Sequence, residues 1–135
     1  MKINTKIRYG LRMLIAIAQG GQLVNTTELG NKMLVSPKYL RKLAGPLEKA
    51  GLIKSVQGIY GGYQLAKAPE EITLRSLMEA FNEKVSLADC LLGKKCELKD
   101  SCLARQVWEM LEKTIEKRFL PISLRDILGN RVDMP

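Results

Sequence analysis

The sequence contains no histidine among its 135 residues. Histidine is the commonest general base and a frequent metal ligand. Its absence therefore excludes Ser–His–Asp catalysis, Cys–His catalysis and histidine-bound metal centres within this chain. The sequence also lacks a Cys-x-x-Cys pair, a phosphate-binding glycine loop and any run of about 18 apolar residues, the length that a membrane-spanning helix needs. We predict that the chain is not an enzyme and does not enter a membrane.

The beginning of the chain only superficially resembles a secretion signal. A basic stretch is followed by the mostly apolar residues 11–18, but Arg12 interrupts the apolar run. The same residues fit one face of an amphipathic helix better. We therefore predict a cytoplasmic protein, whose three cysteines are reduced thiols or metal ligands rather than disulfides.

Acidic residues are scarce in the first half of the chain. The formal net charge is +8, from 22 lysines and arginines against 14 aspartates and glutamates. Residues 1–66 hold ten basic and two acidic residues, whereas residues 67–135 hold 12 of each. A basic half beside a neutral half suggests a polyanion-binding region joined to a second region. Nucleic acid is the favoured polyanion because clustered Lys and Arg release its counterions, and an anionic membrane is the rival.

Two short helices joined by a tight turn are predicted within the basic half. Asn25 is a good N-cap for the first helix. Ser36 is a good N-cap for the second helix, and Pro37 suits its first position. The dipeptide Gly45-Pro46 predicts a kink or a break further along the second helix. This pattern is a helix-turn-helix.

A glycine-rich hairpin is predicted next. Residues 52–56 and 63–66 read as strands, and residues 57–62 form the loop between them. A helix-turn-helix followed by a hairpin is a winged helix, so the predicted fold class is mainly α with a small β-hairpin wing. We predict a DNA-binding region at 1–68 and a second region, with a cysteine loop and a long helix, at 69–135.

The second helix of the pair has the composition of a DNA recognition helix. Its apolar residues share one stripe, and its other faces carry basic and aromatic side chains. Such side chains read base edges in the major groove, while Lys and Arg hold phosphates. An ordinary solvated helix face is the alternative, but the turn, the wing and the localised charge favour DNA. The candidate DNA contacts are Thr5, Arg8, Ser36, Lys38, Tyr39, Arg41, Lys42, Gln57 and Tyr60.

A polar loop with three evenly spaced cysteines forms a second candidate site. Cys90, Cys96 and Cys102 are separated by five residues each. Buried structural cysteines are one interpretation, but thiolate ligation of a metal suits a polar loop better. Zinc normally takes four ligands in closely spaced pairs, whereas an iron–sulfur cluster accepts wider cysteine spacing. A metal-free thiol switch, in which two cysteines oxidise, stays open as a third interpretation.

The cysteine count leaves a fourth metal ligand unassigned. Asp89, Glu97 and Asp100 lie within or beside the loop and carry suitable oxygen atoms. Water, a small thiol or a partner subunit would serve equally well.

Together these features resemble the Rrf2 family of bacterial winged-helix regulators, which includes the iron–sulfur assembly repressor and the nitric-oxide-sensing repressor. The resemblance covers about residue 1 to about residue 130. The residues that carry it are Thr5-Lys6, Ser36-Pro37-Lys38-Tyr39-Leu40, Leu47-Glu48-Lys49-Ala50-Gly51-Leu52, Gly61-Gly62-Tyr63-Gln64-Leu65-Ala66, Pro69-Glu70-Glu71-Ile72-Thr73-Leu74 and the three-cysteine loop.

The resemblance implies a homodimer that binds a palindromic double-stranded operator. It implies that Cys90, Cys96 and Cys102 hold a [2Fe–2S] or [4Fe–4S] cluster, whose presence, redox state or loss changes DNA affinity. The long helix after the cysteines would cross its partner in the dimer. The corresponding dimerisation residues are Leu103, Val107, Trp108, Leu111 and Ile115.

Three positions depart from the family pattern. Arg105 stands where the assembly repressor has a histidine ligand, and Arg8 stands where the nitric-oxide sensor has a carboxylate. Gln57 replaces the arginine that usually precedes the wing glycine. The cluster type therefore stays open. A regulator without a cluster, which responds by thiol oxidation or to a small ligand, is the alternative function.

Overall fold

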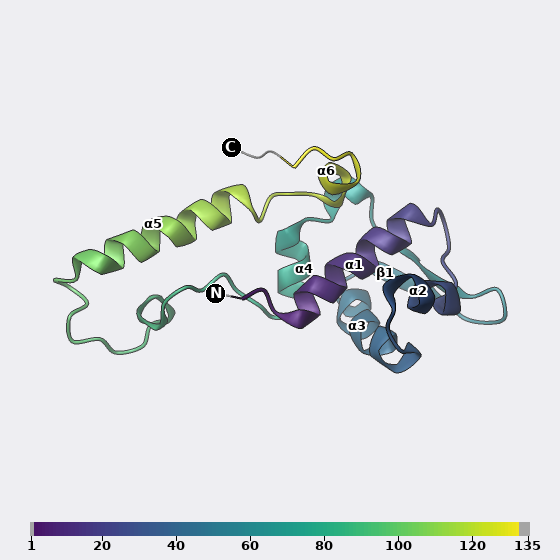
Figure 1. Cartoon of the computed structure of the whole chain (residues 1–135), viewed down its shortest axis with the longest axis horizontal. Helices are drawn as coiled ribbons and strands as arrows, with labels where there is room; N and C mark the ends of the chain where they lie inside the picture. Colours follow the sequence, from purple (N-terminus) through teal and green to yellow (C-terminus); the bar gives the residue numbers. More distant parts are fainter. Residues whose placement is uncertain (1, 133–135) are drawn as a thin grey trace.

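The computed structural model describes residues 2–132, which form a mainly helical chain with one hairpin. Figure 1 shows the first three helices and the hairpin at one end of the long axis, and a long helix beside an extended loop at the other. The α-helices are α1 (Thr5–Gln19), α2 (Thr26–Met33), α3 (Pro37–Lys49), α4 (Leu74–Ala80), α5 (Leu103–Arg118) and α6 (Leu124–Leu128). The strands are β1 (Ile53–Val56) and β2 (Gly62–Leu65), and the 3₁₀ helices are η1 (Pro69–Glu71) and η2 (Asp89–Leu92).

Side-chain caps fix the starts of α2 and α3, as the sequence predicts. The Asn25 side chain accepts hydrogen bonds from the backbone N–H groups of Thr27 and Glu28, at 2.8 and 3.3 Å. The Ser36 hydroxyl accepts one from the Tyr39 N–H at 3.1 Å. These bonds satisfy amides that have no partner within the helix. α2 ends at Met33 and α3 begins at Pro37, so only a short turn separates the two helices of the helix-turn-helix.

The sequence predicts a kink or a break at Gly45-Pro46, and the break is wrong, because α3 continues to Lys49. Proline removes one helical hydrogen bond and crowds the preceding turn. Leu43 and Leu47, on either side of the dipeptide, are both buried in the same core. Core packing on both sides therefore holds the helix together across the proline.

The hairpin is anchored to the helical body. β1 and β2 pair antiparallel, from Ile53 opposite Leu65 to Val56 opposite Gly62. Val24, in the turn between α1 and α2, exchanges two backbone hydrogen bonds with Tyr63, at 2.8 and 2.9 Å. The base of the wing is thus fixed relative to α1, while its loop extends outward (Figure 1).

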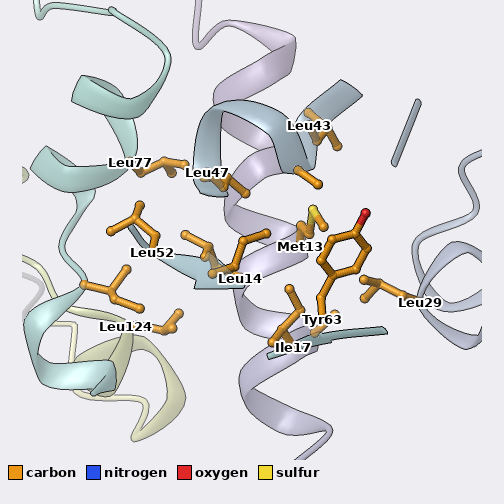
Figure 2. Packing of buried hydrophobic residues seen from close by; sticks show 14 of the residues in the cluster. Met13, Leu14, Ile17, Leu29, Leu43, Leu47, Leu52, Tyr63, Leu77 and Leu124 are labelled. Carbon is orange, nitrogen blue, oxygen red and sulfur yellow. The ribbon is translucent and has the colours of Figure 1, made fainter. Parts of the chain in front are cut away.

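One hydrophobic core joins the first three helices, the hairpin, α4 and α6. Figure 2 shows Met13, Leu14 and Ile17 of α1 in the middle of this packing. Leu77 of α4 and Leu124 of α6 are buried in the same cluster. A core of this kind holds α1 and α3 in a fixed mutual arrangement.

α5 lies outside this core. It contains 16 residues, and none of them is buried. Its end is tied to the body through Leu120, which is buried and follows the helix. Within residues 2–132, no helix is long and apolar enough to cross a membrane.

Candidate nucleic-acid interface and cysteine loop

The exposed face of α3 is basic. Leu40, Leu43, Ala44 and Leu47 are buried on its inner face. Lys38, Arg41 and Lys42 are all exposed, so the helix presents three cations to solvent. The predicted recognition helix therefore has the expected division between a buried stripe and a basic surface.

Tyr39 is half-buried and lies against α1. Its ring meets that of Tyr9 edge-on, with 5.7 Å between centroids and an interplanar angle of 90°. The guanidinium carbon of Arg12 lies 5.1 Å from the centroid of the Tyr9 ring, a cation–π distance. This chain of contacts links the basic face of α1 to the start of α3. Arg12 was not among the predicted DNA contacts, although its helical spacing from Arg8 could have suggested it.

The other predicted residues of α1 lie on the same exposed side. Thr5 is the first residue of α1, and its hydroxyl accepts a hydrogen bond from the Arg8 guanidinium at 3.4 Å. Thr5, Arg8 and Arg12 are all exposed. Arg8 and Arg12 form a short basic strip along the helix with Thr5 at its start, because residues three and four apart share a helix face.

The basic side chains of α1 and α3 form no ion pairs with any residue that the structure describes. Three salt bridges occur among residues 2–132: Lys94 with Asp89, Arg105 with Glu109, and Arg125 with Glu70. All three involve residues beyond the hairpin. The cations of α1 and α3 can therefore meet phosphate groups without first breaking one of these salt bridges.

The wing places its two predicted contacts at an exposed loop. Gln57 and Tyr60 both face solvent, and Ile59 beside them is also exposed. The predicted DNA contacts thus come from three elements: α1, α3 and the loop of the hairpin.

The three cysteines occupy different parts of their loop. Cys90 lies in η2 and is half-buried, Cys96 is exposed in a turn, and Cys102 is half-buried at the position before α5. No group of three metal-binding side chains forms within the described part of the chain. The donor chemistry of three thiols suits an iron–sulfur cluster, but these thiols are not gathered into a ready-made site.

Arg105 lies close to the cysteine loop. Its Nε donates to Glu109 at 2.9 Å, and its Nη1 donates to the backbone carbonyl of Cys90 at 3.3 Å. The hydrogen bond to Glu109 raises the pKa of Arg105 above its ordinary value. Arg105 therefore connects η2 to α5 and remains a cation.

The predicted dimerisation residues line the uncovered part of α5. Leu103, Val107 and Trp108 are exposed by 78%, 50% and 43%, whereas Leu111 and Ile115 are half-buried. Ile115 also lines a cleft of about 430 Å³ between the start of α1, the segment after α4 and the end of α5. α5 thus carries apolar side chains that its own chain leaves largely uncovered.

Comparison with known proteins decides the family. The Rrf2 family model, described as an iron-dependent transcriptional regulator, matches residues 3–130. The chain belongs to the Rrf2 family. The resemblance seen in the sequence is therefore confirmed, and the chain is a helix-turn-helix transcription regulator rather than an enzyme.

Individual Rrf2 proteins match over nearly the whole chain. The protein rrf2 of Nitratidesulfovibrio vulgaris is 35% identical over 95% of this chain and 87% of its own length. The HTH-type transcriptional regulator IscR of Cereibacter sphaeroides is 33% identical over 98% of this chain and 90% of its own length. Both relatives are matched through the cysteine loop as well as the DNA-binding half.

Solved Rrf2 structures share the fold. CymR, the global cysteine regulator of B. subtilis, superposes with a TM-score of 0.81 at 29% identity, over 96% of this chain and 98% of CymR. IscR of T. potens gives a TM-score of 0.73 at 30% identity, over 96% of this chain and 88% of that protein. The predicted fold class, mainly α with a hairpin wing, is confirmed.

Proposed function

We propose that two copies of this chain bind a palindromic DNA operator and that the cysteine loop controls their affinity for it. Residues 1–68 supply the DNA contacts, and residues 69–135 supply the sensor and the dimer contacts. The observation that carries the DNA-binding surface is the set of cations on α1 and α3, which are exposed and form no salt bridge within residues 2–132. In a dimer, the two α3 helices would meet half-sites about one DNA turn apart, roughly 34–36 Å, or a multiple of it.

The DNA-binding surface is tested with an operator selected from random duplexes. Arg41→Ala and Lys42→Ala each remove one exposed cation from α3. Each variant should bind the operator more weakly and reduce the slope of log affinity against log salt by about 1 for each phosphate that is no longer neutralised. Lys113→Ala and Lys117→Ala are matched controls, because they remove exposed cations from α5. Equal effects of both pairs would contradict the assignment of α3.

We propose that a second copy of the chain packs against the exposed apolar residues of α5. An isolated helix of this length is marginal in water, because most helical stability in proteins comes from tertiary packing. The exposed Leu103, Val107 and Trp108 offer the apolar contacts that a dimer would bury. The family resemblance points to the same arrangement, with α5 crossing the partner.

Cys90, Cys96 and Cys102 are the residues that we propose to hold an iron–sulfur cluster. The description of the family as iron-dependent supports this choice. When bound, such a cluster supplies a group that is sensitive to redox state and to iron supply.

The exposed loop can rearrange around a metal at little cost in packing. Every residue from 93 to 101 is exposed, so movement of the loop disrupts no buried packing. Two interactions are present in this conformation of the loop: the hydrogen bond from Arg105 to the Cys90 carbonyl and the salt bridge between Lys94 and Asp89. We propose that these two interactions are the ones that change when the loop closes around a cluster.

Anaerobic purification tests the cluster directly. Visible absorption, with iron and sulfide counted per chain, should show a bound cluster, and Cys96→Ser should lose it. Thr114→Ser is a conservative control, because that hydroxyl bonds within α5 to the Met110 carbonyl. A colourless, iron-free protein after reconstitution would overturn the cluster. The favoured sensor would then be thiol oxidation of the same cysteines, or a small ligand.

A further inference from the structure

The wing carries two large apolar side chains at its tip. Ile59 is 89% exposed and Tyr60 is 90% exposed. Single exposed apolar residues are common on protein surfaces. Here two neighbours lie together on a loop that projects from the body of the molecule (Figure 1). They are consecutive residues, so the loop exposes apolar surface at two neighbouring positions rather than at one.

The shape of this tip is fixed by backbone contacts. The Gly61 N–H donates to the Gly58 carbonyl at 3.0 Å, which closes the turn that holds Ile59 and Tyr60. A Cβ atom at Gly61 would collide with the Val56 carbonyl oxygen, so only glycine fits there. Gly58 has a φ of +104°, a conformation that glycine adopts easily. The apolar pair is therefore presented on a defined turn.

The tip carries no charge with which to hold a phosphate. Residues 57–62 contain neither lysine nor arginine, and the cation nearest in sequence is the exposed Lys54 on β1. The basic residues of α1 and α3 already supply phosphate contacts in the proposed DNA complex. In a protein whose phosphate contacts come from α1 and α3, a neutral apolar tip is better suited to contact stacked bases inside a groove than to contact the charged DNA backbone.

We propose that Ile59 and Tyr60 act as an apolar wedge, which enters the minor groove beside the α3 half-site and partly unstacks one base step. Apolar side chains inserted in this way kink DNA and select flexible pyrimidine–purine steps without a hydrogen-bond code. The wedge would thus favour operators in which the base step under the wing is easily deformed. This inference rests on the proposed function, since it needs a DNA complex.

Fluorescent 2-aminopurine, placed at the base step under the wing, tests the wedge. Footprinting of the full-length protein on its selected operator locates that step. Unstacking should brighten the probe when the native protein binds. The double variant Ile59→Ser and Tyr60→Ser should lose most of the brightening and at least about tenfold in affinity, with the salt slope unchanged.

Lys54→Gln is the matched control on the same hairpin. It removes an exposed cation from β1 and should leave the brightening intact. Circular dichroism and the thermal midpoint verify that both variants fold. If the double variant still brightens the probe, or loses affinity through a smaller salt slope, the wedge is wrong. Failure of the native protein to select any operator would overturn the proposed function as well, whereas operator binding without unstacking would overturn only the wedge.

Discussion

At the scale of single residues, Arg12 is a candidate phosphate contact that the sequence analysis did not name. It is exposed on α1 and lies over the Tyr9 ring, which in turn touches Tyr39 at the start of α3. A cation–π contact restrains a long side chain and so reduces the entropy lost when it binds a phosphate. We infer that Arg12 is a preorganised phosphate contact.

Arg12→Ala should weaken binding to all operator sequences alike and reduce the salt slope by about 1. Titrations of a fluorescent operator at several salt concentrations measure both effects. Tyr9→Phe retains the aromatic ring under the guanidinium and should have little effect, whereas Tyr9→Leu removes it and should weaken binding. A loss of discrimination between operators, with an unchanged slope, would contradict a phosphate role for Arg12.

The sequence predicted the exposure of individual residues only in part. The helical spacing predicted that Lys38, Arg41 and Lys42 lie outside the buried stripe of α3, and all three are exposed. Tyr39 was grouped with them, yet it is half-buried against Tyr9. That contact joins residues 30 positions apart, and periodicity within a single helix carries no information about such a partner.

At the scale of elements, α6 is stabilised by a reciprocal cap whose strength depends on pH. The Ser123 hydroxyl accepts from the Asp126 N–H, and the Ser123 N–H donates to the Asp126 carboxylate, both at 3.0 Å. The Ser123 backbone bond, followed by its side-chain bond and nearby Arg131, holds the pKa of Asp126 below its ordinary value of 3.8. A depressed pKa in the folded state means that the ionised carboxylate favours folding.

The contribution of Asp126 to stability should be complete above about pH 4 and should disappear as the pH falls through its folded pKa. Asp126→Asn should therefore unfold at lower urea than the native protein at neutral pH, with the difference shrinking under acid conditions. Urea unfolding followed by circular dichroism at several pH values measures this. A difference that is the same at every pH would show that Asp126 acts by packing or hydrogen bonding alone.

Element positions followed from the sequence wherever a cap or a turn fixed them. Asn25 and Ser36 cap α2 and α3 as expected. The continuity of α3 across Pro46 could not be predicted in this way, because it depends on a core shared with other elements. Nor do the spacings of the three cysteines reveal that the thiols lie apart in the described loop.

At the scale of the whole molecule, the proposed sensor and the wing lie at opposite ends of the long axis (Figure 1). The start of α1 lies between them. There the Asn4 side chain donates to Glu83 at 3.1 Å, which joins α1 to the segment that leads into the cysteine loop. Under the proposed function, this contact would carry movement of the cysteine loop to the basic strip of α1.

Under the proposed function, dimerisation brings two half-site contacts together on one palindromic operator. Linking two half-site contacts raises affinity through effective concentration, by about 100-fold or more when the geometry allows both to engage. The double variant Val107→Glu and Trp108→Glu places charge on the exposed apolar residues of α5. It should sediment as a monomer and lose about this factor in affinity for the full operator, while binding an isolated half-site normally.

A charge-matched variant separates dimer contacts from a general electrostatic effect. Gln106→Glu with Lys113→Gln lowers the net charge equally, at exposed polar positions of the same helix. It should remain a dimer and bind the operator nearly as the native protein does. If the Val107 and Trp108 variant stays dimeric in sedimentation, α5 is not the interface. If it is monomeric yet binds the full operator normally, the two half-sites are not read together, because an energetic link between them would then be absent.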